Sequence, residues 1–558
     1  MSGFDGGYYF IKEPLVRGGR HRHTAADSND AISDLALNAI NIIQATPWRI
    51  NDWILAVCDQ LQKNSAELPG VTEENSQMVL PDRPDDFSNR TEKEQQRWYR
   101  QVRAVKRAKR RKKSRVGAVQ RTLTIARRLQ NAPELYFGHF FDFRTRIYPM
   151  SQDLHPQGDE IARALLIFKQ GRPLGQRGLF WLAVRMANCA GMDRLSYEQR
   201  VEWVIDHHQQ IMNSGLTPLD GNGFWQNVEK PFSFLATCRE WALAHQLYDP
   251  EQYLSRLPVP LDGSVNGIQH LSMLCKDHTG AFLTNCSSDP HRHDLYETIA
   301  VRVKDQIAIH QQKGCNFAAR WQLDQITRKV VKRAVMTTPY GVTERGIRNQ
   351  LLEDGHISGI DGNPVENAAF LQAQIMEAMG AEIGPARAVM DYFQAVAHKL
   401  ALAKTPLIWT NPAGSRITQS YYRLRKKRIR TMVGQLVLQS SKGSRTLDAR
   451  RQKSGSAPNV IHAFDAAHLQ RSVVDCQQHY DIHDYSMIHD SFATHADNTD
   501  RLSQVLRRQM YEIYRTNPLL TFHQEMCLRA PPGTTLPDPP DLGSFNPKEV
   551  LMAPYFFS

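Results

Sequence analysis

Two aspartates at the ends of short apolar runs have the residue type and setting to hold a catalytic metal. Asp262 follows the run Leu257–Leu261, and Asp490 follows His489 after the run Tyr485–Ile488. Short apolar runs bounded by turn residues are typical of buried strands. Phosphoryl transfer to a sugar hydroxyl uses carboxylates that bind two Mg²⁺ ions about 4 Å apart, so the pair would suit that reaction. Each aspartate alone would equally suit a helix cap or a turn.

A basic helix expected over residues 328–341 separates the two aspartates in the sequence. Positions spaced by four lie along one face of an α-helix, and this face carries Arg328, Lys332, Met336 and Tyr340. The cations suit the phosphates of a nucleoside triphosphate, and the tyrosine end suits its base or sugar. We expect nucleotide to be bound through Arg328, Lys332, Arg333, Met336, Tyr340 and Gly341. The three features together indicate nucleotidyl transfer, which none of them indicates alone.

The composition of the chain favours a polyanionic partner. Its 558 residues include 69 Lys plus Arg against 57 Asp plus Glu, a formal charge of +12, and such a surplus is typical of nucleic-acid binding. The eight cysteines are scattered without a CxxC pair, which indicates reduced thiols rather than zinc ligands. No apolar run reaches membrane-spanning length, and the N-terminus lacks an apolar signal core. We therefore expect a cytoplasmic protein with no membrane partner.

The segments around these motifs predict a mixed α/β fold that is mainly helical. Helical patterns dominate residues 290–400, and a further helix is expected over residues 36–62. Residues 103–115 are dense in Lys and Arg and are expected to form a helix that contacts phosphates. Residues 412–440 have a basic middle and are expected to form a β-hairpin or an extended loop.

Taken in order, these motifs resemble those of a known enzyme superfamily. Asp262, then the Arg328–Gly341 helix, then His489–Asp490 are similar to the A, B and C motifs of polymerases with the right-hand fold. The resemblance implies a thumb, a palm and fingers, with a small antiparallel palm sheet. It also implies two Mg²⁺ ions bound by Asp262, Asp490 and the Gly263 carbonyl, and a catalytic Lys332 that protonates the leaving pyrophosphate.

The position five residues after the first aspartate distinguishes RNA from DNA synthesis in this superfamily. DNA polymerases carry Glu there, where it blocks a 2′-hydroxyl, whereas this chain has Gly267. Gly267–His270 and Met336 resemble the single-subunit, phage- and mitochondrial-type DNA-dependent RNA polymerases. The expected activity is therefore template-directed synthesis of RNA from ribonucleoside triphosphates. The alternatives are a DNA polymerase or primase-like enzyme, and a non-catalytic nucleic-acid-binding protein that kept the fold.

The resemblance extends over nearly the whole chain and adds further site residues. Residues 142–148 match the family segment that contacts template and hybrid, with Thr145 in place of the family's Gly. His462 matches the histidine that recognises the ribonucleotide together with Tyr340. The resemblance assigns template or hybrid contacts to Arg144, Arg146, Tyr296 and His489.

The resemblance also divides the chain into domains. They are a remnant of an N-terminal domain (1–50), a thumb-like helical region (51–132), a first palm segment (133–278), fingers that include the hairpin 412–440 (279–462), and a second palm segment with a C-terminal foot (463–558). Gly6–Tyr9 and residues 39–51 resemble the end of the family's N-terminal domain, which grips and melts promoter DNA. The rest of that domain has no counterpart here, which fits a polymerase split over two polypeptides, a truncated gene, or a minimal enzyme with different initiation. The expected partners are DNA template, RNA transcript and nucleotides, and in the first case a separate N-terminal-domain-like subunit or promoter-melting factor.

Overall fold

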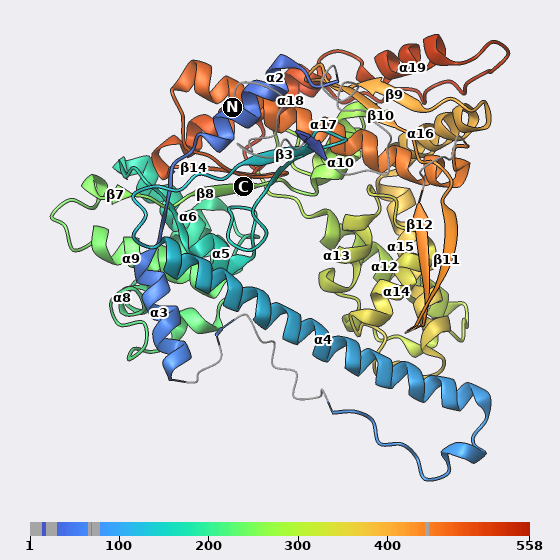
Figure 1. Cartoon of the computed structure of the whole chain (residues 1–558), viewed down its shortest axis with the longest axis horizontal. Coiled ribbons are helices and arrows are strands. Elements are labelled where there is room, and N and C mark those ends of the chain that lie inside the picture. The colour runs from blue at the N-terminus through green and yellow to red at the C-terminus, as the bar shows by residue number, and fades with distance from the viewer. Residues whose placement is uncertain (1–13, 18–30, 65–67, 70–78, 433, 441–445) are drawn as a thin grey trace.

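The computed structural model describes residues 14–17, 31–64, 68–69, 79–432, 434–440 and 446–558. Helices dominate the chain and the sheets are small, which confirms the expected mixed, mainly helical α/β class (Figure 1). None of the helices within these ranges is long and apolar enough to cross a membrane. The Gly6–Tyr9 segment lies outside the described residues.

A three-stranded antiparallel sheet carries both candidate catalytic aspartates. Its strands, in order across the sheet, are β13 (Ser486–Ile488), β14 (Ser491–Thr494) and β8 (Val259–Asp262). Apolar residues of β8 and β14 lie in the hydrophobic core, which explains why these short runs form strands. The pairing of Ser491 with Asp262 brings the turn at Asp490 next to the end of β8. The C-terminus lies at the same edge, because the Ser558 N–H donates to the Asp262 carbonyl at 3.1 Å.

Helices surround this sheet in separate groups (Figure 1). The group at the left comprises α3 (Asp52–Lys63), α5 (Glu160–Ala164), α6 (Gly175–Cys189), α7 (Tyr197–Asp206), α8 (His208–Leu216) and α9 (Pro231–Ala244). The group at the right comprises α12 (Leu295–Gln312), α13 (Arg328–Thr337), α14 (Glu344–Glu353) and α15 (Pro364–Glu382). Across the top run α2 (Asp34–Gln44), α16 (Gly384–Leu402), α17 (Ala449–Tyr480), α18 (Thr499–Tyr514) and α19 (Pro518–Arg529). After β8 come α10 (Asn266–Cys275) and α11 (His278–Leu283), which pack against each other.

The basic helix expected around residues 103–115 is part of the longer helix α4 (Glu92–Leu129), which extends away from the body of the molecule (Figure 1). Its C-terminal part packs on the core through Leu123, which is fully buried. Near the middle of the helix, Arg107 lies 3.5 Å from Glu353 of α14. The helix therefore bridges from the left-hand group of helices to the right-hand group.

The prediction of a single helix over residues 36–62 is wrong. The structure has α2 ending at Gln44 and α3 beginning at Asp52, with β2 (Trp48–Ile50) between them. Pro47 has no N–H with which to continue a helix, and β2 pairs antiparallel with β5 (Leu166–Phe168). The strand forms because of a partner far away in the sequence, which helical periodicity does not reveal.

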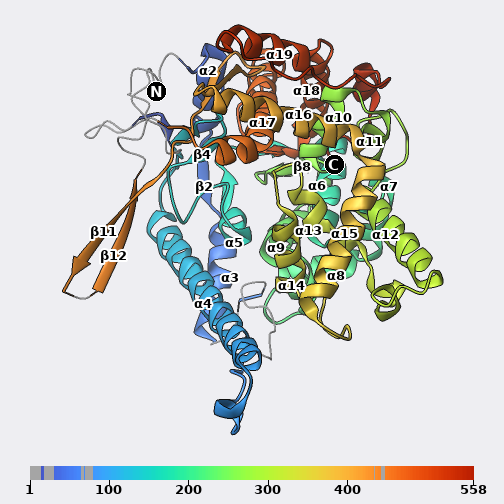
Figure 2. The ribbon, with the colours of Figure 1, turned by 90° about the vertical axis from the view of Figure 1, so that its right-hand side faces the viewer.

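The hairpin expected within residues 412–440 is present. Strands β11 (Arg425–Thr431) and β12 (Gly434–Ser440) pair antiparallel and project from the body (Figure 2). The same span also holds β10 (Arg416–Gln419), which pairs with β9 (Leu407–Thr410). The exposed side chains of β11 include Lys426, Lys427 and Arg428, so the projecting hairpin is basic.

Thr145 adopts a left-handed backbone in the turn between β3 (His139–Asp142) and β4 (Ile147–Pro149), with φ 67°. This conformation disfavours a residue with a Cβ by about 1–2 kcal/mol. Two contacts hold it in place: Gln470 Nε2 donates to the Thr145 carbonyl at 2.8 Å, and Asn411 Nδ2 donates to Oγ1 at 3.1 Å. The turn therefore keeps a glycine-like geometry although it has no glycine.

Replacing Thr145 tests this strain. Thr145→Ala and Thr145→Gly both lose the contact with Asn411, but only glycine relieves the left-handed backbone. We expect the Gly variant to unfold at a higher temperature than the Ala variant, with a free energy of unfolding about 1 kcal/mol larger. At ordinary backbone positions a Gly variant is usually less stable than the Ala variant. Thermal unfolding of both variants gives the order, and a more stable Ala variant would contradict the strained turn.

Candidate active site

Asp262 and Asp490 lie at one edge of the sheet formed by β13, β14 and β8. Asp262 ends β8 and is exposed, and Asp490 lies in the turn between β13 and β14. The Gly263 N–H donates to the Asp490 carbonyl at 3.1 Å, which fixes the two segments side by side. His489 adopts a left-handed backbone (φ 52°), and its ring centroid lies 4.7 Å from that of Tyr148. The structure thus brings together two aspartates that are far apart in the sequence.

Burial and neighbouring carboxylates disfavour a negative charge on Asp490. Its pKa is raised to about 6, first by burial and then by the charge of Asp465, with a smaller contribution from Asp262. Arg146 opposes this shift. The neighbouring negative charges destabilise the deprotonated form of Asp490. A divalent cation at this edge would offset that repulsion and so favour the charged Asp490 carboxylate.

The oxygen donors at this edge suit Mg²⁺. Within the described residues, no three His, Cys, Asp or Glu side chains are grouped closely enough to hold a metal ion by themselves. Mg²⁺ is commonly bound through one or two carboxylates and completes its coordination with water and substrate phosphates. Asp262 and Asp490, which the backbone pairing places next to each other, are the carboxylates that could hold such an ion.

A polar cavity of about 320 Å³ opens beside Asp262. Its basic lining residues are Arg194, Lys230, Arg292, Arg328 and Lys332, and its acidic ones are Asp193, Glu229, Asp262 and Asp294. Cations here would bind phosphate oxygens while a carboxylate binds the accompanying metal. Arg194, Lys230 and Arg292 were not predicted, because they come from separate segments that no local pattern links.

Helix α13 places two of its predicted residues at this cavity and directs a third away from it. Arg328 Nε donates to Asp294 at 2.5 Å, and the guanidinium lies 5.0 Å from the ring centroid of Tyr296. Lys332, one turn further along, also lines the cavity. Arg333 instead pairs with Asp354 of α14 at 2.5 Å. Of the four residues predicted on one face, Arg328 and Lys332 line the cavity, while Met336 and Tyr340 are not among its lining residues. Arg333 lies on another side of the helix.

The buried side of α13 anchors it, since Val330 and Ala334 are both buried. The helix ends at Thr337, one residue beyond Met336, which is 42% exposed. Gly341 then turns the chain with φ 75°. This end of the helix presents Tyr340 to the region beside the aspartates.

Tyr340 and His462 form a stacked pair, with ring centroids 4.7 Å apart and planes 16° apart. Burial lowers the pKa of His462 to about 2, with nearby guanidinium groups acting in the same direction, so its imidazole is neutral. Gly267 packs directly against this wall: a Cβ there would lie 2.9 Å from Pro339 Cβ and 3.2 Å from the Tyr340 hydroxyl. In this structure the space beside Gly267 is therefore occupied by Pro339 and Tyr340 rather than open.

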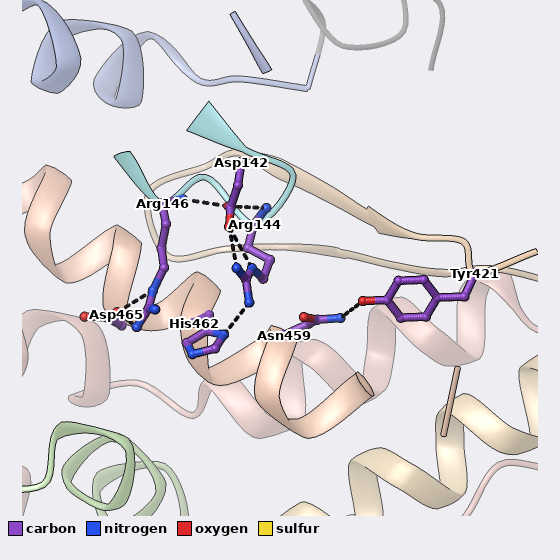
Figure 3. A network of polar contacts seen from close by, with 7 residues as sticks. All are labelled: Asp142, Arg144, Arg146, Tyr421, Asn459, His462 and Asp465. Atoms are coloured by element: carbon purple, nitrogen blue, oxygen red, sulfur yellow. Dashed lines mark hydrogen bonds and ion pairs between the residues drawn. The ribbon is translucent and has the colours of Figure 1, made fainter. Parts of the chain in front are cut away.

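Arg144 and Arg146 are held in a network of polar contacts (Figure 3). Arg144 pairs with Asp142 at 2.5 Å, and its Nη1 lies 2.6 Å from Nδ1 of His462. Arg146 pairs with Asp465. Asp465 was not predicted from the sequence, although its spacing of three from His462 places both residues on one side of α17. The network connects the β3–β4 turn to α17 beside the Tyr340–His462 stack.

The raised pKa of Asp490 gives a pH-dependent prediction for stability. In the metal-free protein, Asp490→Asn should raise the free energy of unfolding by roughly 1–3 kcal/mol at pH 8, since one pKa unit corresponds to about 1.4 kcal/mol. The folded pKa of about 6 exceeds the ordinary value of 3.8, so the wild type loses stability as the pH rises from about 4 to about 6. The loss is complete above about pH 6 and small at pH 4, where the folded carboxylate is protonated and the unfolded one is only partly ionised. Denaturant unfolding at both pH values measures this gain, and an equal gain at pH 4 would contradict it.

Comparison with known proteins places these features in a family. The family model for DNA-dependent RNA polymerase matches residues 172–536. The chloroplastic/mitochondrial DNA-directed RNA polymerase 2B of Nicotiana tabacum is 32% identical over all of this chain and 55% of its own length. The chloroplastic/mitochondrial DNA-directed RNA polymerase 2 of Arabidopsis thaliana is 31% identical over all of this chain and 56% of its own. The chain thus spans a little over half the length of these relatives.

The family match includes both aspartates, helix α13 and the basic hairpin. The small antiparallel sheet between groups of helices agrees with the right-hand polymerase fold predicted from the motifs. The chain belongs to the DNA-dependent RNA polymerase family.

Proposed function

We propose that the chain catalyses DNA-templated RNA synthesis by nucleotidyl transfer from ribonucleoside triphosphates. The observation that carries this proposal is the position of Asp262 and Asp490 at one sheet edge, where Asp262 borders the cavity lined by Arg328 and Lys332. The relatives' names, DNA-directed RNA polymerase, support the same reaction.

We further propose that Asp262, Asp490 and the Gly263 carbonyl hold two Mg²⁺ ions. When bound, such ions lower the pKa of an attacking 3′-hydroxyl and neutralise charge on the triphosphate. Arg328 and Lys332 bind phosphate oxygens, and Lys332 supplies a proton to the leaving pyrophosphate. Arg194, Lys230 and Arg292 add positive charge along the same cavity and extend the phosphate-binding surface.

The proposed sugar-binding wall consists of Tyr340, His462 and Gly267. Neutral His462 accepts from Arg144 at Nδ1, so its Nε2–H is able to donate to a hydroxyl. Its stack with Tyr340 holds both rings at fixed positions. Tight packing of Gly267 against Tyr340 sets how close α10 comes to this wall. These contacts support selection of ribose over deoxyribose.

We propose roles for the outlying elements from their charge and position. Helix α4 is the thumb and contacts the phosphates of template and transcript, because its exposed basic residues cross between the two groups of helices. The hairpin β11–β12 recognises promoter DNA through its basic strand. The remaining domains follow the boundaries predicted from the sequence. We also propose that the chain acts in the cytoplasm.

An extension assay on a preformed RNA–DNA scaffold tests the catalytic assignment. The purified chain with Mg²⁺ should extend the RNA with ribonucleotides and only weakly with deoxyribonucleotides. Asp490→Ala should lower the extension rate by at least about a hundredfold, as losses of single charge-stabilising groups do in other active sites. Unchanged extension by this variant, or a preference for deoxyribonucleotides, would contradict the proposal.

Gly267→Ala tests the close packing beside Tyr340. The added Cβ would lie 2.9 Å from Pro339 Cβ, so the wall must shift, and we expect kcat/KM for ribonucleotides to fall about tenfold, or 1.4 kcal/mol. Gly380→Ala is the matched control, because a Cβ at that helical glycine meets nothing within 4 Å. Equal activity of the two variants would show that the packing at Gly267 does not matter for catalysis.

A further inference from the structure

Asp465 is a buried carboxylate that the proposed chemistry does not use. It is 1% exposed and lies on α17, one helical turn beyond His462. Arg146 Nε donates to its Oδ2 at 2.9 Å, and Asn266 Nδ2 donates to its Oδ1 at 2.9 Å. Asp465 thus has one charged donor and one neutral donor, each from a different segment of the chain (Figure 3 shows the pair with Arg146).

The two donors belong to segments that border Tyr340. Asn266 is the first residue of α10 and immediately precedes Gly267, which packs against the Tyr340 hydroxyl. Arg146 follows the β3–β4 turn, whose other arginine contacts Nδ1 of His462. His462 in turn stacks on Tyr340. Asp465 therefore hydrogen-bonds both to the start of α10 and to Arg146, while lying on the helix that carries His462.

We propose that Asp465 is a positioning residue for sugar selection: it fixes the start of α10, Arg146 and His462 relative to one another around Tyr340. This inference rests on the proposed function, because it assigns the residue to the choice between ribose and deoxyribose. Asp465 acts through Asn266 and Arg146, which it contacts, and the structure shows it bonded to no group of the cavity lining.

The charge of Asp465 matters because a carboxylate only accepts hydrogen bonds. Asn266 must therefore turn its Nδ2 toward Asp465, which leaves its Oδ1 buried and without a hydrogen-bond partner among the described residues. An amide at position 465 would donate as readily as it accepts. Asn266 would then have two allowed orientations, and Arg146 would lose the charge with which it pairs.

The plainer explanation is that Asp465 only holds the fold together. Asp475 provides a matched control, since it lies on the same helix and is also buried. It accepts from Arg508 Nε at 2.9 Å and from Gln509 Nε2 at 2.6 Å, a charged and an amide donor as at Asp465, and it also contacts His479 Nδ1 at 2.7 Å. Arg508 and Gln509 lie on α18, and His479 lies in the last turn of α17, more than four turns beyond His462.

The experiment compares Asp465→Asn, Asn266→Ala and Asp475→Asn. For each variant, kcat and KM are measured for ATP and dATP on a preformed RNA–DNA scaffold, with thermal unfolding recorded in parallel. We expect Asp465→Asn to lower the ratio of kcat/KM for ATP over dATP about tenfold, as changes to supporting residues commonly do. Asn266→Ala, which keeps the Arg146 pair, should lower this ratio by a smaller factor. Asp475→Asn should lower the unfolding temperature and leave the ratio within about twofold of wild type.

The outcomes separate the two proposals. If folded Asp465→Asn keeps the wild-type ratio, or if Asp475→Asn lowers the ratio equally, Asp465 is not a sugar-positioning residue. If Asp465→Asn does not fold, Asn266→Ala decides, and a wild-type ratio for that variant overturns the inference. If the wild-type chain extends the scaffold with neither nucleotide, the proposed function itself is refuted and the inference with it.

Discussion

The antiparallel pairing of β14 with β8 is the interaction on which the site depends. It sets Ser491 opposite Asp262, and the preceding turn then places Asp490 at the same edge. The pairing is stabilised by buried apolar residues on both strands, while the two carboxylates at its end repel each other. The fold therefore holds together two like charges that would separate in water, and this arrangement favours binding of a divalent cation.

Several residues near the site have a strained, left-handed backbone. Thr145, Val265 and His489 all have left-handed φ values, and each lies beside a group assigned to nucleotide, metal or template. Such conformations persist only where the surrounding structure imposes them. Here the restraints are visible: Gln470 and Asn411 hold Thr145, and the tight hairpin holds His489.

Local patterns in the sequence predicted the elements that are determined locally. Spacing by four correctly grouped Arg328 and Lys332 at the cavity, although Tyr340 lies beyond the end of α13. The apolar runs before Asp262 and Asp490 identified the strands. Patterns failed where a distant partner decides the outcome. The β2 strand forms because it pairs with β5, and it interrupts an otherwise helical segment.

The site residues that the sequence did not predict also depend on contacts between segments far apart in the chain. Arg194, Lys230 and Arg292 meet at the cavity only after folding. Asp465 resembles any other buried helical acid until its contacts with Asn266 and Arg146 are seen. Domain boundaries and the partner expected for promoter melting came from resemblance rather than from local patterns.

Metal binding at the Asp262–Asp490 edge is the most direct test of the whole account. Mn²⁺ reports binding by electron paramagnetic resonance, and the titration is run with a non-hydrolysable ribonucleoside triphosphate present. The account predicts about two Mn²⁺ ions per wild-type chain, as in other two-metal sites, and loss of this binding in the Asp262→Asn/Asp490→Asn double variant. Equal Mn²⁺ binding by the wild type and the folded double variant would contradict it.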